Sequence, residues 1–540
     1  MRLLKQSLKC AFILTIVIVF GQIAVAAKTS ELAPVNPEFL EDMSPARNVV
    51  KALATDSLMT GWVPSPISPE VHQVYYDILT ATLSDPIYDL RDPDSDGDNA
   101  DSVLPPVKNQ GTCGSCWSFA TYGTLESLLK KQTGAVNDFS ENHLKQLHGF
   151  DPGPCDGGNI QMSSAYFSRY HGVVTEAEDS DDQTATKQPC ITCSPSQYVD
   201  SAVFMPVKAN VNDNDYIKQA LMDHGALYVS FFWSSGAYTA SDYTYYYTGS
   251  GSNHAVVVVG WDDTKITAAA QPGAFIVRNS WGDSWGENGY FYVSYYDTSF
   301  AFRSLGYIDD HKNDTPKKVY FHDTLGMTGA WGYGDGEDWG ANVFTPDEDG
   351  IINAVSFYAT ASGLTYEVFI YDEFNKNPVS FTGQLGTTVH GSVDHMGYYT
   401  VRLAESVPVT AGNSFGVVVK FTTPGYIYSI PLERPIGGYS SAAEASPDES
   451  FISDTGSSWE DLTSQLSNSN VCIKALEFVS TKGDVDNDGS ITLADSVLSL
   501  QIITGLVDAS LINISADVNG DNKIGVAEVV YVLQHVSGIR

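Results

Sequence analysis

The sequence predicts an α+β protein of several domains: a mixed domain, then an antiparallel β-sandwich, then a small α-helical domain. Its 540 residues exceed the size of one ordinary domain. Residues 117–131 carry apolar side chains at helical spacing, whereas the chain beyond residue 316 changes to short apolar runs separated by Gly, Asn, Asp and Pro. The predicted segments are a signal peptide (1–26), a pro-segment (27–83), a mixed domain (84–310), a β-sandwich (316–479) and a calcium-binding module (482–540).

The first 26 residues have the pattern of a secretory signal peptide. Basic residues precede a short apolar run at 11–20, and small residues lead up to Ala26. No later stretch approaches the ~20 apolar residues of a membrane span. We expect the protein to be secreted, as an extracellular or cell-surface associated protein.

The formal net charge of −36 and the pI near 4.4 argue against a nucleic acid as the partner. Acidity of this degree favours solubility and the binding of divalent cations.

Residues 27–83 contain no chemical motif and include a Pro-rich stretch at 62–69. Two interpretations remain open: a pro-segment that covers the active site during export, or an N-terminal extension that belongs to the mature fold.

Three short segments supply the groups that a thiol nucleophile requires. Residues 110–119 (QGTCGSCWSF) include Gln110 and place Cys116 at the start of the predicted helix. The free N–H groups and dipole of a helix N-terminus favour a negative charge such as a thiolate. Further along the chain, His254 lies before the apolar strand pattern of 255–259, and Asn279 follows a similar run at 274–277.

These segments, together with CDGG at 155–158 and NSWG at 279–282, resemble the ordered motifs of the papain family of cysteine peptidases. The resemblance covers roughly residues 84 to 310. It implies a papain-like two-lobe catalytic domain, with Cys116 on a helical lobe, His254 and Asn279 on a β lobe, and the substrate cleft between them.

The resemblance also implies a role for each matching residue. Cys116 would be the nucleophile, His254 the imidazolium paired with it, Asn279 the residue that orients the imidazole, and Gln110 an oxyanion-hole donor. Cys113 and Cys155 occupy the positions of a family disulfide. The implied substrate-binding residues are Gly157, Gly158, Ile160, Ser252, Trp281 and Trp285.

The remaining cysteines have less specific contexts. Cys190 and Cys193 suggest a small disulfide loop or two independent thiols, since no second pair nearby completes a zinc site. Cys472 lies in an apolar stretch and is expected to pack as a small hydrophobic residue.

Residues 316–479 resemble the lectin-like sandwich that follows the catalytic domain in some bacterial members of this family. Short strand patterns at 351–359, 366–371, 398–403 and 414–421 carry this inference. Carbohydrate binding and a structural or substrate-positioning role are equally compatible with it.

The C-terminal region contains two copies of a calcium-loop pattern. Oxygen-bearing residues recur at alternate loop positions, each copy ends in an acidic residue, and an apolar helix pattern follows. We therefore expect two Ca²⁺ sites. The predicted ligands are Asp484, Asp486, Asp488, Ser490, Thr492 and Asp495 in the first loop, and Asp517, Asn519, Asp521, Lys523 (by its carbonyl) and Glu528 in the second.

This module resembles a dockerin more than a pair of full EF-hands, because no helix precedes the first loop. The resemblance implies a cohesin-type or surface partner; a calcium-stabilised terminal cap is the alternative.

The combined prediction is a secreted cysteine endopeptidase that hydrolyses peptide bonds through a thioester on Cys116. The alternative is a surface or scaffold-associated binding protein with a catalytically silent papain-like domain. An intact set of Gln110, Cys116, His254 and Asn279 favours the enzyme.

Overall fold

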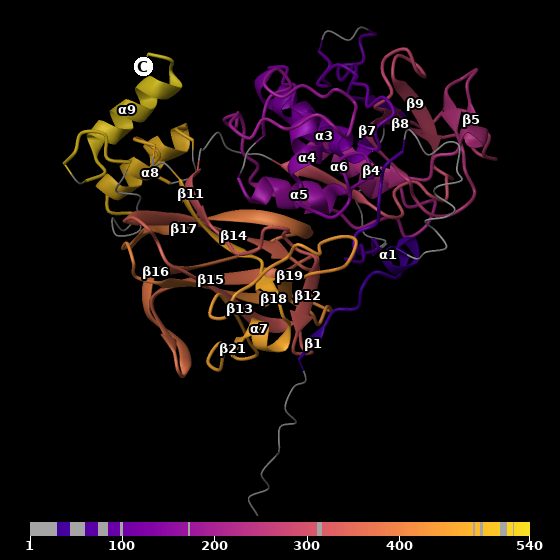
Figure 1. Ribbon diagram of the computed structural model, residues 1–540. Coiled ribbons are helices and arrows are strands. Elements are labelled where there is room, and N and C mark those ends of the chain that lie inside the picture. The colour runs from indigo at the N-terminus through magenta and orange to yellow at the C-terminus, as the bar shows by residue number, and fades with distance from the viewer. Residues whose placement is uncertain are drawn as a thin grey trace, which may run out of the picture.

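The computed structural model describes residues 30–43, 60–73, 85–97, 101–170, 173–309, 316–478, 481–486, 490–507, 516–521 and 523–539. The predicted signal peptide lies outside these residues, as do parts of the predicted pro-segment and the predicted calcium ligand Asp488. Among the described helices, none has both the length and the apolar character that crossing a membrane requires. Figure 1 shows a mixed domain in purple and magenta, a β-sandwich in orange and a pair of yellow helices.

The helical lobe of the mixed domain is built around α3 (Cys116–Thr133), as the apolar spacing predicted. Almost every side chain of its first three turns is buried, and Gly134 ends it in a left-handed conformation with φ 73°. Ser140 caps α4 (Glu141–Leu147), and Asn159 caps α5 (Ile160–Ser168) with its side-chain oxygen.

The β lobe contains the three strands expected from apolar runs: β7 (His254–Asp262), β8 (Ala274–Arg278) and β9 (Tyr290–Ser294). They pair antiparallel in that order, so His254 at the start of β7 lies near the end of β8. The other elements of this lobe are β2 (Ile87–Asp89), β3 (Ser201–Phe204), α6 (Asp215–His224), β4 (Leu227–Phe231), the 3-10 helix η2 (Ser235–Ala237), β5 (Tyr238–Thr239), β6 (Thr244–Tyr245) and β10 (Leu305–Asp309).

The β-sandwich confirms the strand pattern of its sequence. A six-stranded antiparallel sheet packs through a buried apolar cluster against strands of a second sheet. The six strands, in sheet order, are β16 (Val379–Ser392), β15 (Thr365–Lys376), β18 (Phe415–Thr422), β13 (Glu337–Phe344), β20 (Ser450–Ser453) and β21 (Glu460–Asp461). The opposing strands are β11 (Pro316–Tyr320), β23 (Ile473–Phe478), β14 (Gly350–Ala359) and β17 (Met396–Val409), and the short helix α7 (Leu462–Gln465) follows β21.

One sheet continues from the sandwich into the mixed domain. Strand β17 pairs antiparallel with β3, with Tyr398 opposite Ala202 and Met396 opposite Phe204. The hydroxyl of Tyr170, from the helical lobe, lies 2.9 Å from Thr400 Oγ1. The sequence suggested two successive domains, whereas the structure joins them through backbone hydrogen bonds into one thirteen-stranded sheet.

The N-terminal segment contacts both halves of the molecule. Strand β1 (Glu31–Leu32) adds to the edge of a small sheet of β12 (Gly329–Gly332), β19 (Ile430–Glu433) and β22 (Asn470–Val471). Helix α1 (Pro37–Asp42) follows, and the indigo trace in Figure 1 runs from β1 to α1. Residues 60–73, here called the strap, then cross the mixed domain.

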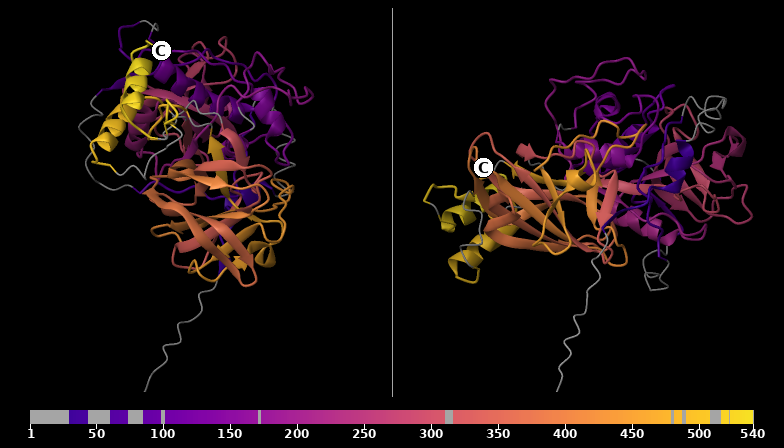
Figure 2. Two further views of the ribbon diagram at one scale, coloured as in Figure 1. Left: turned by 90° about the vertical axis from the view of Figure 1, so that its left-hand side faces the viewer. Right: turned by 60° about the horizontal axis from the view of Figure 1, so that its bottom comes forward.

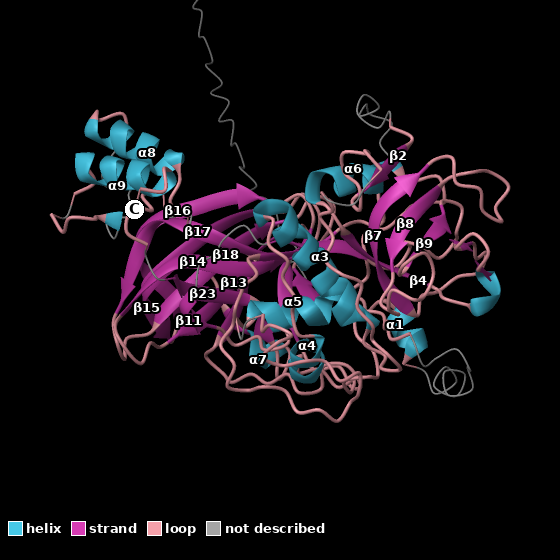
Figure 3. Cartoon of the chain, turned by 90° about the horizontal axis from the view of Figure 1, so that it is seen from above, coloured by secondary structure: helices cyan, strands magenta, loops and turns pink. Residues whose placement is uncertain are grey.

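The C-terminal helices α8 (Leu493–Ile503) and α9 (Val526–Val536) each follow one of the calcium loops, as the apolar helix patterns predicted. They pack around a small cluster containing Val485, Ala516 and Ile524. Figures 2 and 3 show them side by side at one end of the molecule, beside the sandwich.

Candidate active site

Cys116 is the first residue of α3 and is fully buried. Its sulfur accepts a hydrogen bond from the backbone N–H of Ala255 at 3.4 Å and another from the N–H of Gly61 in the strap. The N–H groups of the first helical turn also point toward it and favour its thiolate form. The nucleophile predicted from the sequence therefore lies where the helix, the β lobe and the strap meet.

His254 and Asn279 form the contact that the motifs predicted. His254 Nε2 lies 2.9 Å from Asn279 Oδ1, which holds the ring in one orientation. The Trp281 ring stacks on the imidazole, with centroids 4.8 Å apart and planes 21° apart, and Trp285 packs edge-on against Trp281 at 4.9 Å. Both tryptophans thus shield the His254–Asn279 hydrogen bond from water.

Burial disfavours the charged forms of Cys116 and His254 in this form of the protein. Desolvation raises the pKa of the Cys116 thiol to about 12, despite the opposing effect of the backbone N–H groups. It also lowers the pKa of His254 to about 4. Among the described residues, His254 Nδ1 has no hydrogen-bond partner. Burial therefore works against the thiolate–imidazolium pair expected from the sequence while the strap covers the site.

Gln110 lies beside the nucleophile on the loop that leads into α3. Its Nε2 donates to the carbonyl of Cys113 at 2.8 Å, and its Oε1 accepts from Ser280 Oγ at 2.5 Å. The Gln110 backbone N–H also donates to the Ser280 carbonyl at 2.8 Å. The side chain is fixed by both lobes, as a preorganised oxyanion-hole donor requires.

The strap occupies the cleft that the glycine motif lines. Gly158 N–H donates to the carbonyl of Gly61 at 2.8 Å, and Val63 N–H donates to the carbonyl of Gly158 at 3.1 Å. Trp62 N–H donates to the carbonyl of Asn253 at 3.0 Å, directly before His254. At Gly157, φ is +107° and a Cβ would lie 2.8 Å from both the strap carbonyl of Gly61 and the Val63 side chain, so only glycine suits this position.

The two candidate specificity residues lie on either side of this backbone. Ile160 begins α5, is 1% exposed and belongs to the same buried cluster as Trp62. Ser252 is buried, and its hydroxyl lies 3.4 Å from that of Ser230 on β4.

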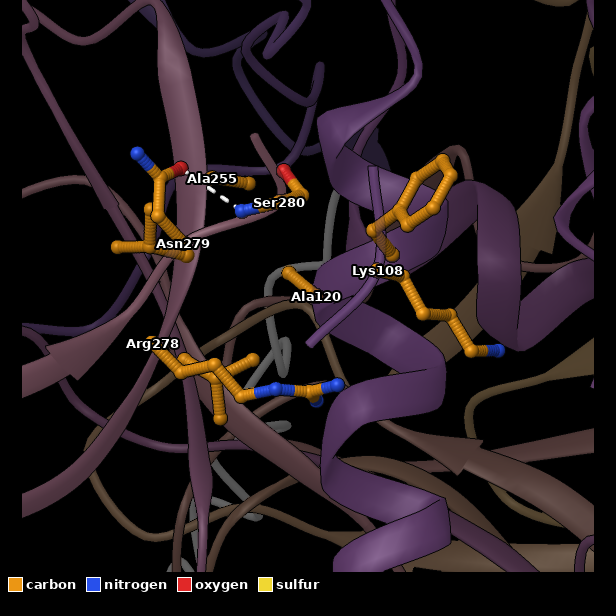
Figure 4. Close-up of a pocket in the computed structure, with 9 residues that line it drawn as sticks. Lys108, Ala120, Ala255, Arg278, Asn279 and Ser280 are labelled. Atoms are coloured by element: carbon orange, nitrogen blue, oxygen red, sulfur yellow. Dashed lines mark hydrogen bonds between the residues drawn. The ribbon is translucent and has the colours of Figure 1, made fainter. Parts of the chain in front are cut away.

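A small cavity lies behind the catalytic residues, between α3 and strands β7 and β8 (Figure 4). Lys108, Ala120, Ala255 and Arg278 line it, and Asn279 Oδ1 accepts from the Ser280 N–H at its edge. No residue of the strap lines it.

The predicted disulfide between Cys113 and Cys155 is present and ties the nucleophile loop to the glycine motif. Cys190 and Cys193 also form a disulfide, which decides between the two alternatives that the sequence left open. Cys472 is a buried free thiol, as expected of a core residue.

The C-terminal loops bring acidic side chains together. The carboxylates of Asp484, Asp486 and Asp495 lie within 4.8 Å of one another. Asp495 accepts the N–H groups of Val485 and Thr492, at 2.7 and 2.8 Å. These are hard oxygen donors, which suit Ca²⁺.

The second loop closes in the same way. Glu528 accepts the N–H groups of Val518 at 3.0 Å and Gly525 at 2.6 Å. The described part of the chain also includes the other predicted ligands Ser490, Thr492, Asp517, Asn519, Asp521 and Lys523.

Sequence reasoning missed several residues of this site. Gly61, Trp62 and Val63 carry no chemical motif, yet they occupy the cleft. Tyr439 comes from the sandwich and bonds to Asn159 beside the glycine motif. Only the Pro-rich composition after Trp62 gave a hint of the strap, and no local signal marks Tyr439.

Comparisons with known proteins agree with this geometry. Residues 92–301 match the family described as "Papain family cysteine protease", and residues 319–477 match "Lectin like domain". Mouse cathepsin K is 30% identical over 213 residues, covering 39% of this chain and 62% of the relative. Mouse pro-cathepsin H is 34% identical over 204 residues, covering 36% of this chain and 57% of the relative. The chain thus spans less than two thirds of the length of either relative.

Solved structures share the arrangement of both domains. The cysteine protease and lectin-like domains of Cwp84, a surface layer associated protein of Clostridium difficile, superpose with a TM-score of 0.68 at 23% identity. That match covers 84% of this chain and 98% of the other. A second Cwp84 structure, after propeptide cleavage, has a TM-score of 0.61 at 25% identity and covers 70% of this chain and 97% of the other.

Proposed function

We propose that this chain, which contains a papain family cysteine protease domain followed by a lectin-like domain, is a secreted cysteine endopeptidase made as a zymogen. The observation that carries the proposal is the alignment of Cys116 at a helix N-terminus with the His254–Asn279 pair beneath Trp281. The strap, which covers this site, is the inhibitory part of the pro-segment.

The chemistry would proceed in two balanced steps. The Cys116 thiolate attacks the peptide carbonyl, and the Gln110 side chain and the backbone N–H of Cys116 stabilise the resulting oxyanion. The imidazolium of His254 protonates the departing amine, which leaves a thioester on Cys116. Neutral His254 then removes a proton from water, the hydroxide attacks the thioester, and the carboxylic acid product leaves as the thiol is regenerated.

Removal of the strap would turn this chemistry on. Its departure removes the Gly61 N–H, which favours the thiolate, but it also lets water reach Cys116 and His254. Water relieves the desolvation that disfavours their charged forms, and desolvation has the larger effect on the pKa of Cys116. The thiolate–imidazolium pair can then form.

The test is labelling by an epoxide probe selective for active-site thiolates, with casein cleavage followed in parallel. The chain is compared before and after pro-segment removal, in wild type, in Cys116→Ala and in Cys472→Ala, which removes the other buried free thiol. We expect labelling and cleavage only after processing, lost in Cys116→Ala and retained in Cys472→Ala. A processed wild type that stays unlabelled would favour the alternative, a catalytically silent binding protein.

Secretion rests on the signal pattern of residues 1–26. Expression with and without these residues, followed by fractionation of the medium, tests it. Retention of the full-length chain inside the cell would contradict this part of the proposal.

A second candidate function, carbohydrate binding, is favoured by the outer face of the six-stranded sheet. Trp339 stacks on Phe369 at 5.5 Å, and Phe369 lies 6.4 Å from Tyr371, with all three rings partly exposed. Such rings offer flat apolar surfaces for the C–H faces of sugars. Binding of the processed protein to a glycan array, lost in Trp339→Ala, would support it; equal binding by this variant would contradict it.

The C-terminal loops are proposed to bind two Ca²⁺ ions. Calcium titration should raise the melting temperature of the wild type, and Asp495→Ala and Glu528→Ala should each remove part of that shift. Lack of any shift would leave the terminal module without its proposed cofactor.

A cohesin-type partner is proposed for the helices of this module. Exposed apolar residues recur at corresponding positions of the two helices: Leu493, Val497 and Leu500 on α8, and Val526, Val530 and Leu533 on α9. Calcium-dependent binding to an immobilised cohesin tests this partner, with Leu500→Asp and Leu533→Asp as the disrupting variant. Absence of binding in calcium would favour the terminal-cap alternative.

A further inference from the structure

A tyrosine of the lectin-like domain reaches the substrate cleft of the peptidase domain. The hydroxyl of Tyr439 lies 3.1 Å from Nδ2 and 3.2 Å from Oδ1 of Asn159. Asn159 directly follows Gly158, the residue whose backbone pairs with the strap. Tyr439 therefore contacts the residue next to the backbone that would bind a substrate, although the two are far apart in sequence.

The peptidase domain fixes the loop that carries this tyrosine. The carbonyl of Tyr439 accepts the N–H of Asp151 at 2.8 Å, and Ser441 Oγ donates to the Asp151 carboxylate at 2.7 Å. The ring of Phe150 packs edge-on against that of Tyr439 at 5.0 Å. These backbone, side-chain and ring contacts hold the Tyr439 ring in one position beside the cleft.

The strap touches the same group of residues. Asn159 Nδ2 also donates to the carbonyl of Val63 at 3.2 Å, and Phe39 of α1 packs edge-on against Tyr439 at 5.4 Å. Both contacts end when the pro-segment leaves. A face of the Tyr439 ring and one donor of Asn159 then become available to a substrate.

Trp62 indicates what kind of side chain this region accepts. Its backbone is the part of the strap that bridges to Gly158, and its side chain is 5% exposed. It belongs to one buried apolar cluster with Ile160, Tyr228 and Tyr439. Burial is the main cause of the raised pKa of Tyr228. Cys116 and Tyr439 raise it further, so Tyr228 lies near both of them.

We propose that Tyr439 is a specificity-determining residue of the peptidase. With Asn159 and Ile160 it walls the pocket for the substrate side chain two residues before the cleaved bond, and it favours a large aromatic or aliphatic side chain there. Asn159 is too short to form this wall by itself, whereas a buried phenol ring supplies a large apolar surface. The inference rests on the proposed peptidase function.

The test uses the full-length chain after pro-segment removal and four peptides that differ only at that position: Trp, Phe, Leu or Ala. Active enzyme is counted by epoxide titration, so that misfolded protein does not enter the rates. In Tyr439→Ala we expect kcat/KM for the Trp, Phe and Leu peptides to fall about tenfold relative to the Ala peptide, mainly through KM. Tyr439→Phe, which keeps the ring, should stay within about threefold of wild type.

Tyr428→Ala is the matched control, because it removes a partly exposed tyrosine of the same domain, on the loop between β18 and β19. Its ratios should equal those of the wild type. If Tyr439→Ala proves unstable, Tyr439→Leu replaces it and should give an intermediate ratio.

The inference would be overturned if Tyr439→Ala left the kcat/KM ratios relative to the Ala peptide unchanged, or if it lowered kcat/KM equally for all four peptides. The proposed peptidase function would still stand in either case if labelling and casein cleavage persisted. A processed wild type without epoxide labelling would instead overturn the proposed function.

Discussion

The N–H of Gly158 donates to the carbonyl of Gly61 at 2.8 Å, so the strap pairs with the floor of the substrate cleft through backbone atoms. Two more backbone bonds, from Val63 to Gly158 and from Trp62 to Asn253, complete the contact. The strap thus engages the groups that would bind a substrate backbone, and it covers Cys116 at the same time. A strap in this position and a bound substrate would exclude one another for this reason.

Enlarging Gly61 should release the strap. A Cβ there would lie 1.9 Å from the carbonyl oxygen of Gly114, a backbone atom that cannot yield. We expect Gly61→Val to accelerate epoxide labelling of the unprocessed chain at least about tenfold, which corresponds to about 1.4 kcal/mol of strap binding. Gly236→Val is the control, since that glycine is exposed in the 3-10 helix η2, with nothing closer than 4.0 Å to its added Cβ. Equal labelling of both variants would show that the strap does not restrict access.

Removal of the Gln110 amide should lower kcat. Because this group is expected to donate to the oxyanion, Gln110→Ala should reduce kcat of the processed enzyme by a factor on the order of 10²–10³. KM should change little. Gln384→Ala, on the exposed strand β16, should match the wild type. A kcat within a factor of about three of the wild type would remove Gln110 from the oxyanion hole.

Lys108 should be a large contributor to stability. Its Nζ lies 2.7 Å from Glu126 and 3.0 Å from Glu141, whose side chains are 1% and 2% exposed, and 2.7 Å from the more exposed Asp138. Lys108→Met leaves the buried acidic side chains of Glu126 and Glu141 without their cationic partner, at an expected cost of about 3–5 kcal/mol in urea unfolding of the Cys116→Ala chain.

The matched control for this substitution is Lys376→Met. The ion pair of Lys376 with Asp448 is 2.8 Å long, but its side chains are 66% and 41% exposed. Water screens such a pair, so its loss should cost less than about 1 kcal/mol. Equal effects of the two substitutions would contradict the role of burial.

Stability should fall as the pH rises from about 6.5 to 8. Burial raises the pKa of Glu141 from 4.5 to about 8, so the native state holds a proton that the unfolded chain has already released. That stabilising contribution is complete below pH 4.5 and is lost as the pH passes through 8. Below pH 6.5, His148 and His254 act in the opposite direction, because burial lowers their pKa values to about 3 and about 4.

Urea unfolding of the Cys116→Ala chain across this range measures the slope. Glu141→Gln keeps an oxygen for Lys108 and cannot titrate, so it should reduce the slope between pH 6.5 and 8. A smaller slope should remain, because burial also raises the pKa values of Glu176 and Glu433 to about 7. Glu373→Gln, on the exposed end of β15, should leave it unchanged. A wild-type stability that rises with pH in this window would contradict the prediction.

The individual helices and strands of this protein could be predicted from its sequence. The helix after Cys116, the strands behind His254 and Asn279, and helices α8 and α9 all follow from apolar spacing, which depends on near neighbours in the chain. The candidate catalytic residues could be identified because their chemistry restricts the residue types at each position.

The contacts between distant segments could not be predicted in this way. The pairing of β17 with β3 joins the two domains through backbone hydrogen bonds, which are available to any sequence and leave no residue signature. The strap binds Gly158 and Asn253 through backbone groups for the same reason.

The sequence by itself determined which groups can carry out thiol chemistry and where the regular elements lie. Only the tertiary structure decided that burial beneath the strap disfavours the charged forms of Cys116 and His254, and that Tyr439 stands beside Asn159. Charge state and pocket shape depend on burial, and burial results from packing between segments that are hundreds of residues apart.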